Sequence, residues 1–199
     1  PSDLDLTSIP GSDMNGEANW LRLVARPSSN EFLYAVQDEN RDLFTARWTG
    51  ASPWVSPIRH DGSTEDINNR NFDIVYATHS ANPGVAWIVW GEGTVVRQNR
   101  WTGVAWAGSG TIGGTADTAL VQLLAHPFSG VVFSAIYEDQ TSGGADRDIL
   151  EMRLTNGAAA WACCNLIWGG PTVNDPVHER VVIAPERYSP TVGWREVFQ

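Results

Sequence analysis

The 199-residue chain contains no lysine, so all 13 of its basic side chains are arginines. Without lysine the sequence excludes a phosphate-binding P-loop, a Schiff base and a lysine general base. The formal net charge of −10 argues against nucleic acid and anionic membrane surfaces as partners, because both require basic patches. The chain also has no run of about 18 apolar residues, so no membrane span is expected.

Cysteine is scarce, and the only two, Cys163 and Cys164, are adjacent. Neighbouring residues on a strand point to opposite faces, so one interpretation is two small buried residues with free thiols. The other interpretation is a vicinal disulfide, which an oxidising compartment would allow. A zinc site is disfavoured, because no second cysteine pair and no nearby histidine complete the ligand shell.

The common catalytic motifs are missing as well: there is no His-Glu-x-x-His motif, no nucleophile elbow and no glycine-rich phosphate loop. His79 and His126 are expected in hairpin turns, where histidines are usually solvated. His60 and His178 are expected in loops between units. A pair of acids for glycoside cleavage stays open. The candidate acids are Glu92, Asp117, Glu138 and Asp139, and the sequence does not select two of them.

What the chain does have is an internal repeat. Three arginines are separated by 53 residues, twice in succession, and each begins a matching stretch that is followed by a tryptophan. The arginines are Arg47, Arg100 and Arg153, and the tryptophans are Trp54, Trp106 and Trp161. A fixed period of this length marks one supersecondary unit that is used several times.

Four runs share a second pattern: apolar residues in alternation, a turn cluster, then apolar residues again, which predicts a β-hairpin. The runs are Trp20–Asp38, Phe72–Trp90, Leu120–Asp139 and Arg180–Phe198, with Ala25, Ala77, Ala125 and Ala184 at equivalent places. A third strand is predicted at Arg41–Trp48, Val95–Trp101 and Arg147–Leu154, and a fourth after the next turn, for example at Trp54–Ile58. No long window has helical spacing, so little helix is expected.

Four short strands in a unit of roughly 50 residues are typical of a β-propeller blade. We therefore predict an all-β fold of about three and a half four-stranded blades. The blades are expected at 19–69, 70–118 and 119–176, with the first hairpin of a further blade at 177–199 and the end of a preceding blade plus a linker at 1–18. Since propellers have about four to eight blades, further blades or other copies of the chain would complete the ring. A closed four-bladed ring, in which Asp3–Ile9 pairs with the last hairpin, is the remaining alternative.

One unit resembles a repeat of the fucose-binding propeller lectins. The resemblance covers Val85–Ile112 and rests on Trp87–Trp90 followed by Arg100–Gly108. Thr102 stands where the lectin turn has aspartate, and the sugar-binding arginine and glutamate of that family have no counterpart that can be placed here. The resemblance therefore implies the fold and not the lectin's binding site.

A second stretch, Glu31–Gly50, is similar to the repeats of periplasmic and secreted bacterial propellers. The similarity rests on Leu33–Val36 and Arg41–Phe44. It implies an extracellular or periplasmic location and a binding or scaffold role.

The repeated arginines are also candidate ligand-binding residues. Guanidinium groups of Arg47, Arg100 and Arg153 suit carboxylates and sugar hydroxyls, and the indoles of Trp48 and Trp101 could stack on a sugar ring. The structural alternative is an arginine that bridges to the next blade, with the tryptophan in the core. Retention in every unit favours the structural alternative, because every blade needs its packing.

A calcium site is the one cofactor that the sequence suggests. Asp38, Asn40 and Asp42 have the spacing of alternate oxygen ligands. However, Leu43 replaces the usual glycine at the sixth position, and the glutamate at the twelfth position is missing. A polar hairpin tip is the simpler interpretation.

These observations predict a non-catalytic, extracytoplasmic β-propeller module for binding or assembly, on a cell surface or in a filament. Its expected partners are a glycan or protein ligand and other copies of the chain or further blades. The alternative is a fragment of a propeller glycoside hydrolase or lyase.

Overall fold

The computed structural model describes residues 17–51, 54–64, 70–78, 84–113, 117–127, 132–139, 147–155, 161–168, 181–185 and 194–198. Regular structure in these residues consists of strands, without helix. Accordingly, the described chain has no helix of the length and apolar character needed to cross a membrane. The strand expected at Asp3–Ile9 lies outside the described residues, as does most of the segment 1–18.

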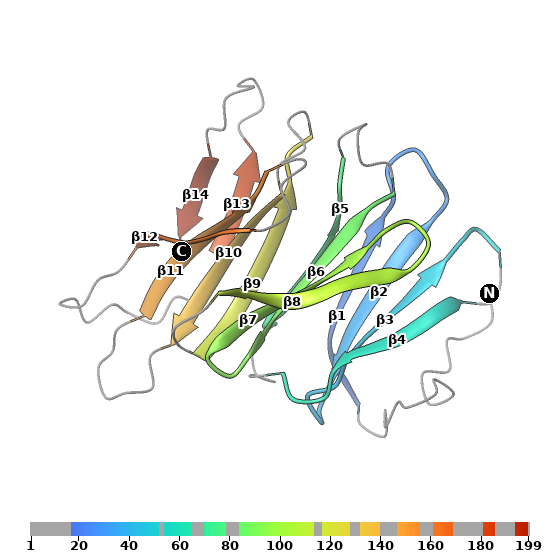
Figure 1. Ribbon diagram of the computed structural model, residues 1–199, viewed down its shortest axis with the longest axis horizontal. Coiled ribbons are helices and arrows are strands. Elements are labelled where there is room, and N and C mark those ends of the chain that lie inside the picture. Colours follow the sequence, from blue (N-terminus) through green and yellow to red (C-terminus); the bar gives the residue numbers. More distant parts are fainter. Residues whose placement is uncertain are drawn as a thin grey trace.

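The strands form antiparallel sheets of consecutive strands (Figure 1). Sheet 1 contains β1 (Ala18–Ala25), β2 (Phe32–Asp38), β3 (Leu43–Trp48) and β4 (Val55–Asp61). Sheet 2 contains β5 (Phe72–Tyr76), β6 (Ala86–Glu92), β7 (Val95–Trp101) and β8 (Trp106–Gly113). Sheet 3 contains β9 (Asp117–Ala125), β10 (Val132–Asp139), β11 (Arg147–Leu154) and β12 (Ala162–Trp168). Sheet 4 pairs β13 (Val181–Pro185) with β14 (Trp194–Phe198). The predicted all-β fold of four-stranded antiparallel sheets is confirmed to this extent.

All four predicted hairpins are present as the antiparallel pairs β1–β2, β5–β6, β9–β10 and β13–β14. Strands β7 and β11 have the predicted bounds, whereas β3 begins at Leu43, two residues later than predicted. The delay has a local cause. Arg41 has a φ of 69°, and its N–H donates to the carbonyl of Asp38 at 3.1 Å, so the chain is still turning at this point.

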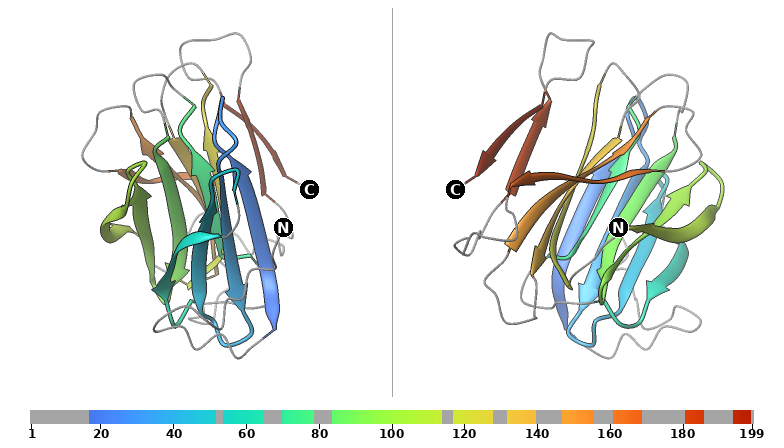
Figure 2. Two further views of the ribbon diagram at one scale, coloured as in Figure 1. Left: turned by 90° about the vertical axis from the view of Figure 1, so that its right-hand side faces the viewer. Right: turned by 60° about the vertical axis from the view of Figure 1, so that its left-hand side comes forward.

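The sheets lie side by side in a row, from sheet 1 to sheet 4 (Figures 1 and 2). The first strands of successive sheets, β1, β5, β9 and β13, contact one another along this row. Sheet 1 packs on sheet 2 through one buried cluster, and sheet 2 packs on sheet 3 through two more. Because neighbours cover both faces of sheet 2, β6 is an almost continuous apolar run instead of an alternating one.

Each interface joins residues from both sheets. The first cluster unites Leu33, Ala35 and Leu43 of sheet 1 with Phe72, Ile74, Tyr76, Ala86, Ile88, Trp90 and Trp101 of sheet 2. The second unites Val89 and Val96 with Val121, Leu123, Leu150 and Met152. The third unites Ala77, Val85 and Trp87 with Ala125 and Leu154.

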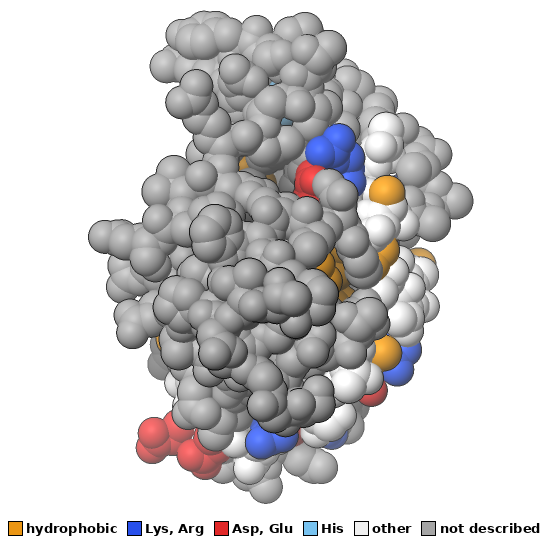
Figure 3. Space-filling model, turned by 90° about the vertical axis from the view of Figure 1, so that its left-hand side faces the viewer, with side chains coloured by type: hydrophobic (Ala, Val, Ile, Leu, Met, Phe, Trp, Pro, Cys, Tyr) orange, Lys and Arg blue, Asp and Glu red, His pale blue; other side chains and the backbone are white. Residues whose placement is uncertain are grey.

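Charged side chains of both signs lie on the described part of one face of the molecule. Figure 3 views the molecule from the left-hand side of Figure 1, and acidic and basic side chains lie close together near its upper right and along its lower edge. Such mixing leaves no basic stripe in the described part of this face.

Gly91 of β6 sets the distance between sheets 2 and 3. A Cβ atom at this position would lie 2.6 Å from the Cβ of Thr118 and 3.0 Å from its carbonyl oxygen. We expect Gly91→Ala to lower the free energy of unfolding by about 1–3 kcal/mol, because it overpacks the interface. Urea denaturation measures the change.

Gly110 of β8 provides the matched control, since a Cβ atom there would meet nothing within 4 Å. Gly110→Ala should change the free energy of unfolding by no more than about 0.5 kcal/mol. Equal losses in the two variants would contradict a close approach of β6 to β9.

Candidate functional site

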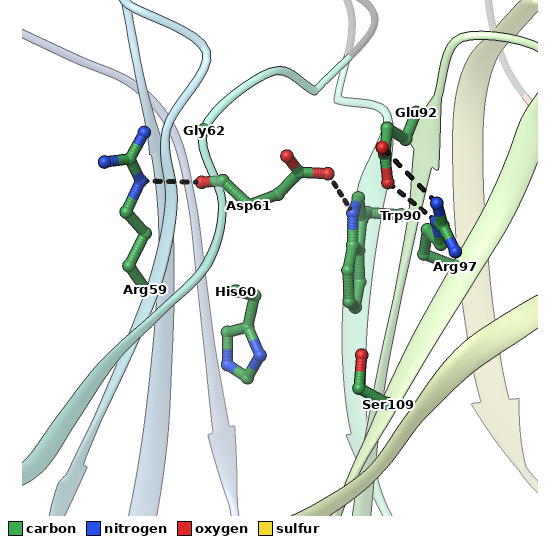
Figure 4. Close-up of a pocket in the computed structure, with 8 residues that line it drawn as sticks. All are labelled: Arg59, His60, Asp61, Gly62, Trp90, Glu92, Arg97 and Ser109. Atoms are coloured by element: carbon green, nitrogen blue, oxygen red, sulfur yellow. Dashed lines mark hydrogen bonds and ion pairs between the residues drawn. The ribbon is translucent and has the colours of Figure 1, made fainter.

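A cleft of about 400 Å³ opens between the last strand of sheet 1 and three strands of sheet 2 (Figure 4). The residues that line it are Arg59, His60 and Asp61 from the end of β4, Gly62 directly after that strand, Trp90 and Glu92 from β6, Arg97 from β7, and Ser109 from β8. The cleft thus lies where two neighbouring sheets diverge, and both sheets supply polar groups to it.

Asp61 connects the two walls. Its Oδ2 accepts the indole N–H of Trp90 at 2.5 Å, across the gap between the sheets. Its Oδ1 accepts hydrogen bonds from the N–H of Ser63 at 2.9 Å and from its hydroxyl at 3.2 Å. The carboxylate therefore holds the tryptophan in place and closes the turn that follows β4.

Glu92 and Arg97 form an ion pair on the opposite wall. The Nε of Arg97 lies 2.7 Å from Oε2 of Glu92, and its second guanidinium edge donates to Thr111 Oγ1 at 2.8 Å. The side chain of Arg97 is 35% exposed and that of Glu92 is 33% exposed. These contacts use only part of the five donors of the Arg97 guanidinium. The ion pair therefore holds the Glu92 carboxylate as an acceptor and the remaining Arg97 N–H groups as donors in a fixed position that solvent can reach.

Arg59 carries a second positive charge on the β4 side. Its guanidinium lies 2.6 Å from Oδ1 of Asp42, and its Nε donates to the carbonyl of Asp61 at 3.3 Å. The cleft therefore has a guanidinium on each wall and two carboxylates between them (Figure 4).

His60 lies at the base of the cleft and joins the sheets by polar and ring contacts. Its Nδ1 is 3.4 Å from Nδ2 of Asn99, which can only donate. Nε2 therefore carries the proton and donates to Thr45 Oγ1 at 2.8 Å. The imidazole also meets the ring of Trp106 edge-on, at 4.6 Å between centroids. Burial lowers the pKa of His60 from 6.5 to about 3, so the ring is neutral at physiological pH.

This arrangement suits recognition of a polar molecule better than proton transfer. Asp61 and Glu92 are already occupied by donors of the chain itself. A general base needs a pKa near the operating pH, and that of His60 lies far below it. Among the described residues no group of three or more His, Cys, Asp or Glu side chains is placed to hold a metal ion.

The models of known protein families, the curated proteins and the solved structures contain no match to this chain.

The predicted ligand residues Arg47 and Trp101 come together, but in the core between sheets 1 and 2. The guanidinium of Arg47 lies 5.0 Å from the centre of the Trp101 ring, and Trp101 is 1% exposed. Arg47 also reaches Glu31 at 3.3 Å, and Glu31 accepts the hydroxyl of Tyr76 at 2.7 Å. Burial, followed by this hydrogen bond, raises the pKa of Tyr76. Arg47 thus occupies the bridging position of the structural alternative.

The other three predicted ligand residues lie apart from one another and outside the cleft. Trp48 packs against Phe32 at 5.6 Å between ring centres. Arg100 lies over the ring of Trp87 at 5.6 Å. Arg153 pairs with Glu151 at 2.6 Å. Their role in ligand binding stays a prediction.

The residues proposed for calcium form the turn between β2 and β3. Oδ1 of Asp38 accepts the N–H groups of Asn40 and Asp42, each at 2.9 Å. Asp42 faces the guanidinium of Arg59, and this positive charge opposes a cation at the same carboxylate. The calcium site stays a prediction, and the hydrogen bonds account for the spacing of these residues without it.

The remaining candidate residues from the sequence are the two cysteines, the histidines and the acids. Cys163 is disulfide-bonded, whereas the side chain of Cys164 lies outside the described residues, so the vicinal ring stays a prediction. Also outside them are the histidines at 79 and 178 and the side chains of Asp117, Glu138 and Asp139. The prediction for His126 was wrong in one respect: it is 1% exposed and therefore not solvated.

The sequence did not single out most of the cleft. His60 was expected in a loop between units, but it lies within β4, which continues to Asp61. One feature of the sequence could have indicated the β4 side of the cleft: the polar run Arg59–Asp61, in a segment whose strand pattern continues past Ile58. Trp90, the hydrogen-bond partner of Asp61, is 29 residues away in the sequence, so no local pattern could have indicated this contact.

Proposed function

We propose that this chain is a non-catalytic β-propeller module whose sheets are successive blades, and that it binds ligands outside the cytoplasm. The up-and-down order of each four-stranded sheet supports the blade interpretation, as does the adjacency of the first strands along the row. The disulfide bond of Cys163 supports an oxidising compartment.

The ligand that best fits the cleft is a saccharide. A sugar offers hydroxyl groups that donate to carboxylates and accept from guanidinium groups. The cleft places the Glu92–Arg97 pair opposite Asp61, with the Trp90 indole between them. This fixed alternation of acceptors and donors, with Asp61 held in place by the buried indole of Trp90, is the observation that carries the proposal.

Removing one fixed donor should weaken saccharide binding. We expect Arg97→Ala to lower the affinity for a saccharide found on a glycan array by at least about tenfold, because a hydrogen bond to a charged group contributes about 1.5–3 kcal/mol. Isothermal titration calorimetry measures the affinity. Arg100→Ala is the comparison: it removes the same residue type from the same strand but outside the cleft. A saccharide bound in the cleft should keep its affinity within about twofold in this variant, whereas a loss in Arg100→Ala alone would favour the ligand role that the sequence predicts for Arg100.

Other outcomes discriminate between the proposals. Absence of binding to every glycan, or equal losses in the two variants, would contradict a saccharide site in the cleft. Asp61 and Glu92 are two carboxylates in one cleft, which is the observation in favour of the glycoside hydrolase or lyase alternative. Cleavage of a polysaccharide by the wild-type chain, abolished in Glu92→Gln, would favour that alternative.

A further inference from the structure

The fourth strand of each four-stranded sheet contains a β-bulge at the same place in the repeat. In every case two residues of the fourth strand lie opposite one residue of the third strand, and these single residues have the same spacing as the repeated arginines. The bulges are Ser56–Pro57 opposite Ala46, Gly108–Ser109 opposite Asn99, and Cys163–Cys164 opposite Met152. A bulge that recurs in each sheet is a structural feature of the unit and not a local defect.

A bulge at this place changes the direction in which side chains point. Residues on a regular strand alternate between the two faces of the sheet, and the extra residue of a bulge interrupts that alternation. In sheet 2 the bulge contains Ser109, which lines the cleft. In sheet 3 the same place holds the only two cysteines of the chain. Strand alternation therefore does not prevent a bond between Cys163 and Cys164.

Cys163 is disulfide-bonded, and Cys164 is the one other cysteine of the chain. Within one chain the bond therefore closes a ring between neighbouring residues. Adjacent Cα atoms lie about 3.8 Å apart across a trans peptide, whereas Cα atoms joined by an ordinary disulfide lie at least about 4.4 Å apart. A disulfide that is forced outside its ordinary geometry is reduced more easily.

The disulfide is also accessible. Cys163 is exposed, and β12 is the terminal strand in the order β12-β11-β10-β9 of sheet 3 (Figure 1). Among the described strands, none pairs with the open edge of β12. Exposed or strained disulfides are the labile ones, whereas structural disulfides resist reduction.

We propose that the bulge of β12 is a redox modification site, at which a dithiol opens a vicinal Cys163–Cys164 disulfide while the chain stays folded. One thiolate of the dithiol attacks a sulfur of the ring, the S–S bond breaks, and the other cysteine leaves as a thiolate that takes up a proton. The second thiol of the reagent then displaces the first cysteine from the mixed disulfide. The chain ends with two thiols, and the reagent is oxidised to a disulfide.

Opening the ring should loosen the pairing of β12 with β11. The ring holds two residues of β12 out of strand alternation, opposite Met152 of β11. Once the ring is open, this constraint on the register of β12 is removed. The bulge of β8 is the comparison within the same chain, because Gly108 forms it with a φ of 81° and without a cysteine.

Alkylation of the native chain tests the site. Iodoacetamide is added with and without dithiothreitol, and mass spectrometry identifies the modified cysteines. We expect no alkylation without the dithiol and alkylation of both cysteines with it. Circular dichroism of the reduced chain should show that it stays folded.

Hydrogen exchange measures the effect on the strand. Reduction by dithiothreitol should accelerate the exchange of β12 amides by at least about tenfold and that of β8 amides by no more than about twofold. The variant that carries both Cys163→Ser and Cys164→Ser controls for the reagent. Its β12 amides should exchange as in the reduced wild type, with or without dithiothreitol.

Four results would overturn the proposal. Alkylation of either cysteine without the dithiol would mean that the thiols are free, and disulfide-linked dimers on a non-reducing gel would place the partner cysteine on a second copy of the chain. Reduction that requires unfolding in urea would mean a closed, structural disulfide. Equal exchange of β12 in both redox states would mean that the ring does not hold the bulge. Saccharide binding at the cleft uses other residues, so this inference and the proposed function can fail separately.

Discussion

Replacing Asp73 with alanine is expected to lower the free energy of unfolding by about 3–5 kcal/mol. Asp73 lies on β5 and is 0% exposed. Its carboxylate contacts groups from three sheets: Arg22 of β1 at 3.0 Å, the N–H of Leu123 on β9 at 2.9 Å, and the N–H of Ile74 in its own strand at 2.9 Å. Alanine would leave two buried N–H donors without their acceptor and would leave a cavity between the sheets.

The protonation of Asp73 adds an expectation about how its contribution to stability depends on pH. Burial raises its pKa, against the lowering effects of Arg70, Arg22 and the two backbone N–H groups. Since the folded pKa lies above the unfolded value, the folded state binds the proton first. The contribution of Asp73 to stability therefore increases as the pH falls through the folded pKa, and becomes constant below the unfolded value. Asp73→Asn, which imitates the neutral form, should destabilise the protein less than alanine does.

Urea denaturation of the two Asp73 variants tests the three-sheet connection. The comparison is Glu92→Ala, which breaks an ion pair whose side chains are about one third exposed and should cost no more than about 1 kcal/mol. A loss in Asp73→Ala no larger than in Glu92→Ala would show that Asp73 does not hold the sheets together.

Strand positions could be predicted from this sequence because their signals are local. Turn residues separate the strands, and apolar alternation fills them, so β7 and β11 could be predicted with their observed bounds. The start of β3 could not, because it depends on the φ of Arg41 and on a carboxylate that closes the turn.

Which neighbouring sheet a residue contacts was harder to predict than the positions of the strands. Ala77 and Ala125 hold equivalent places in the repeat, yet they lie in the same cluster from opposite sides of one interface. Ala77 faces sheet 3, whereas Ala125 faces sheet 2. A difference of one residue in register reverses the face of a strand residue, and similar sequences do not reveal it.

The partners of the repeated arginines could not be predicted from the repeat either. Arg47 bridges to Trp101 in the next sheet, Arg100 lies over Trp87 in its own sheet, and Arg153 pairs with Glu151 in its own strand. The repeat fixes where each arginine leaves the backbone. The partners of Arg47 and Arg100 come from other strands, whereas that of Arg153 comes from its own strand. The cleft likewise combines residues of β4 with residues from the strands of sheet 2.

Acidification should destabilise the wild-type protein through His60. Burial lowers the pKa of His60 from 6.5 in the unfolded chain to about 3 in the folded state. The stability associated with the neutral ring is therefore complete above pH 6.5 and is lost as the pH falls toward 3. The loss is about 1.4 kcal/mol for each pH unit, or about 2 kcal/mol between pH 6.5 and 5.

The variant His60→Gln isolates this effect, because glutamine retains hydrogen-bonding groups for Thr45 and Asn99 and does not titrate. Urea denaturation of both proteins between pH 7.5 and 5 should give free energies of unfolding that converge as the pH falls. Asp73 acts in the opposite direction, and Asp61 and Arg59, the charged neighbours of His60 in the cleft, are present in both proteins, so their contributions cancel in the difference. Parallel pH profiles of the two proteins would contradict the lowered pKa of His60. They would mean that protonation of His60 costs no more in the folded state than in the unfolded chain, so that contact between the two sheets would not require a neutral imidazole.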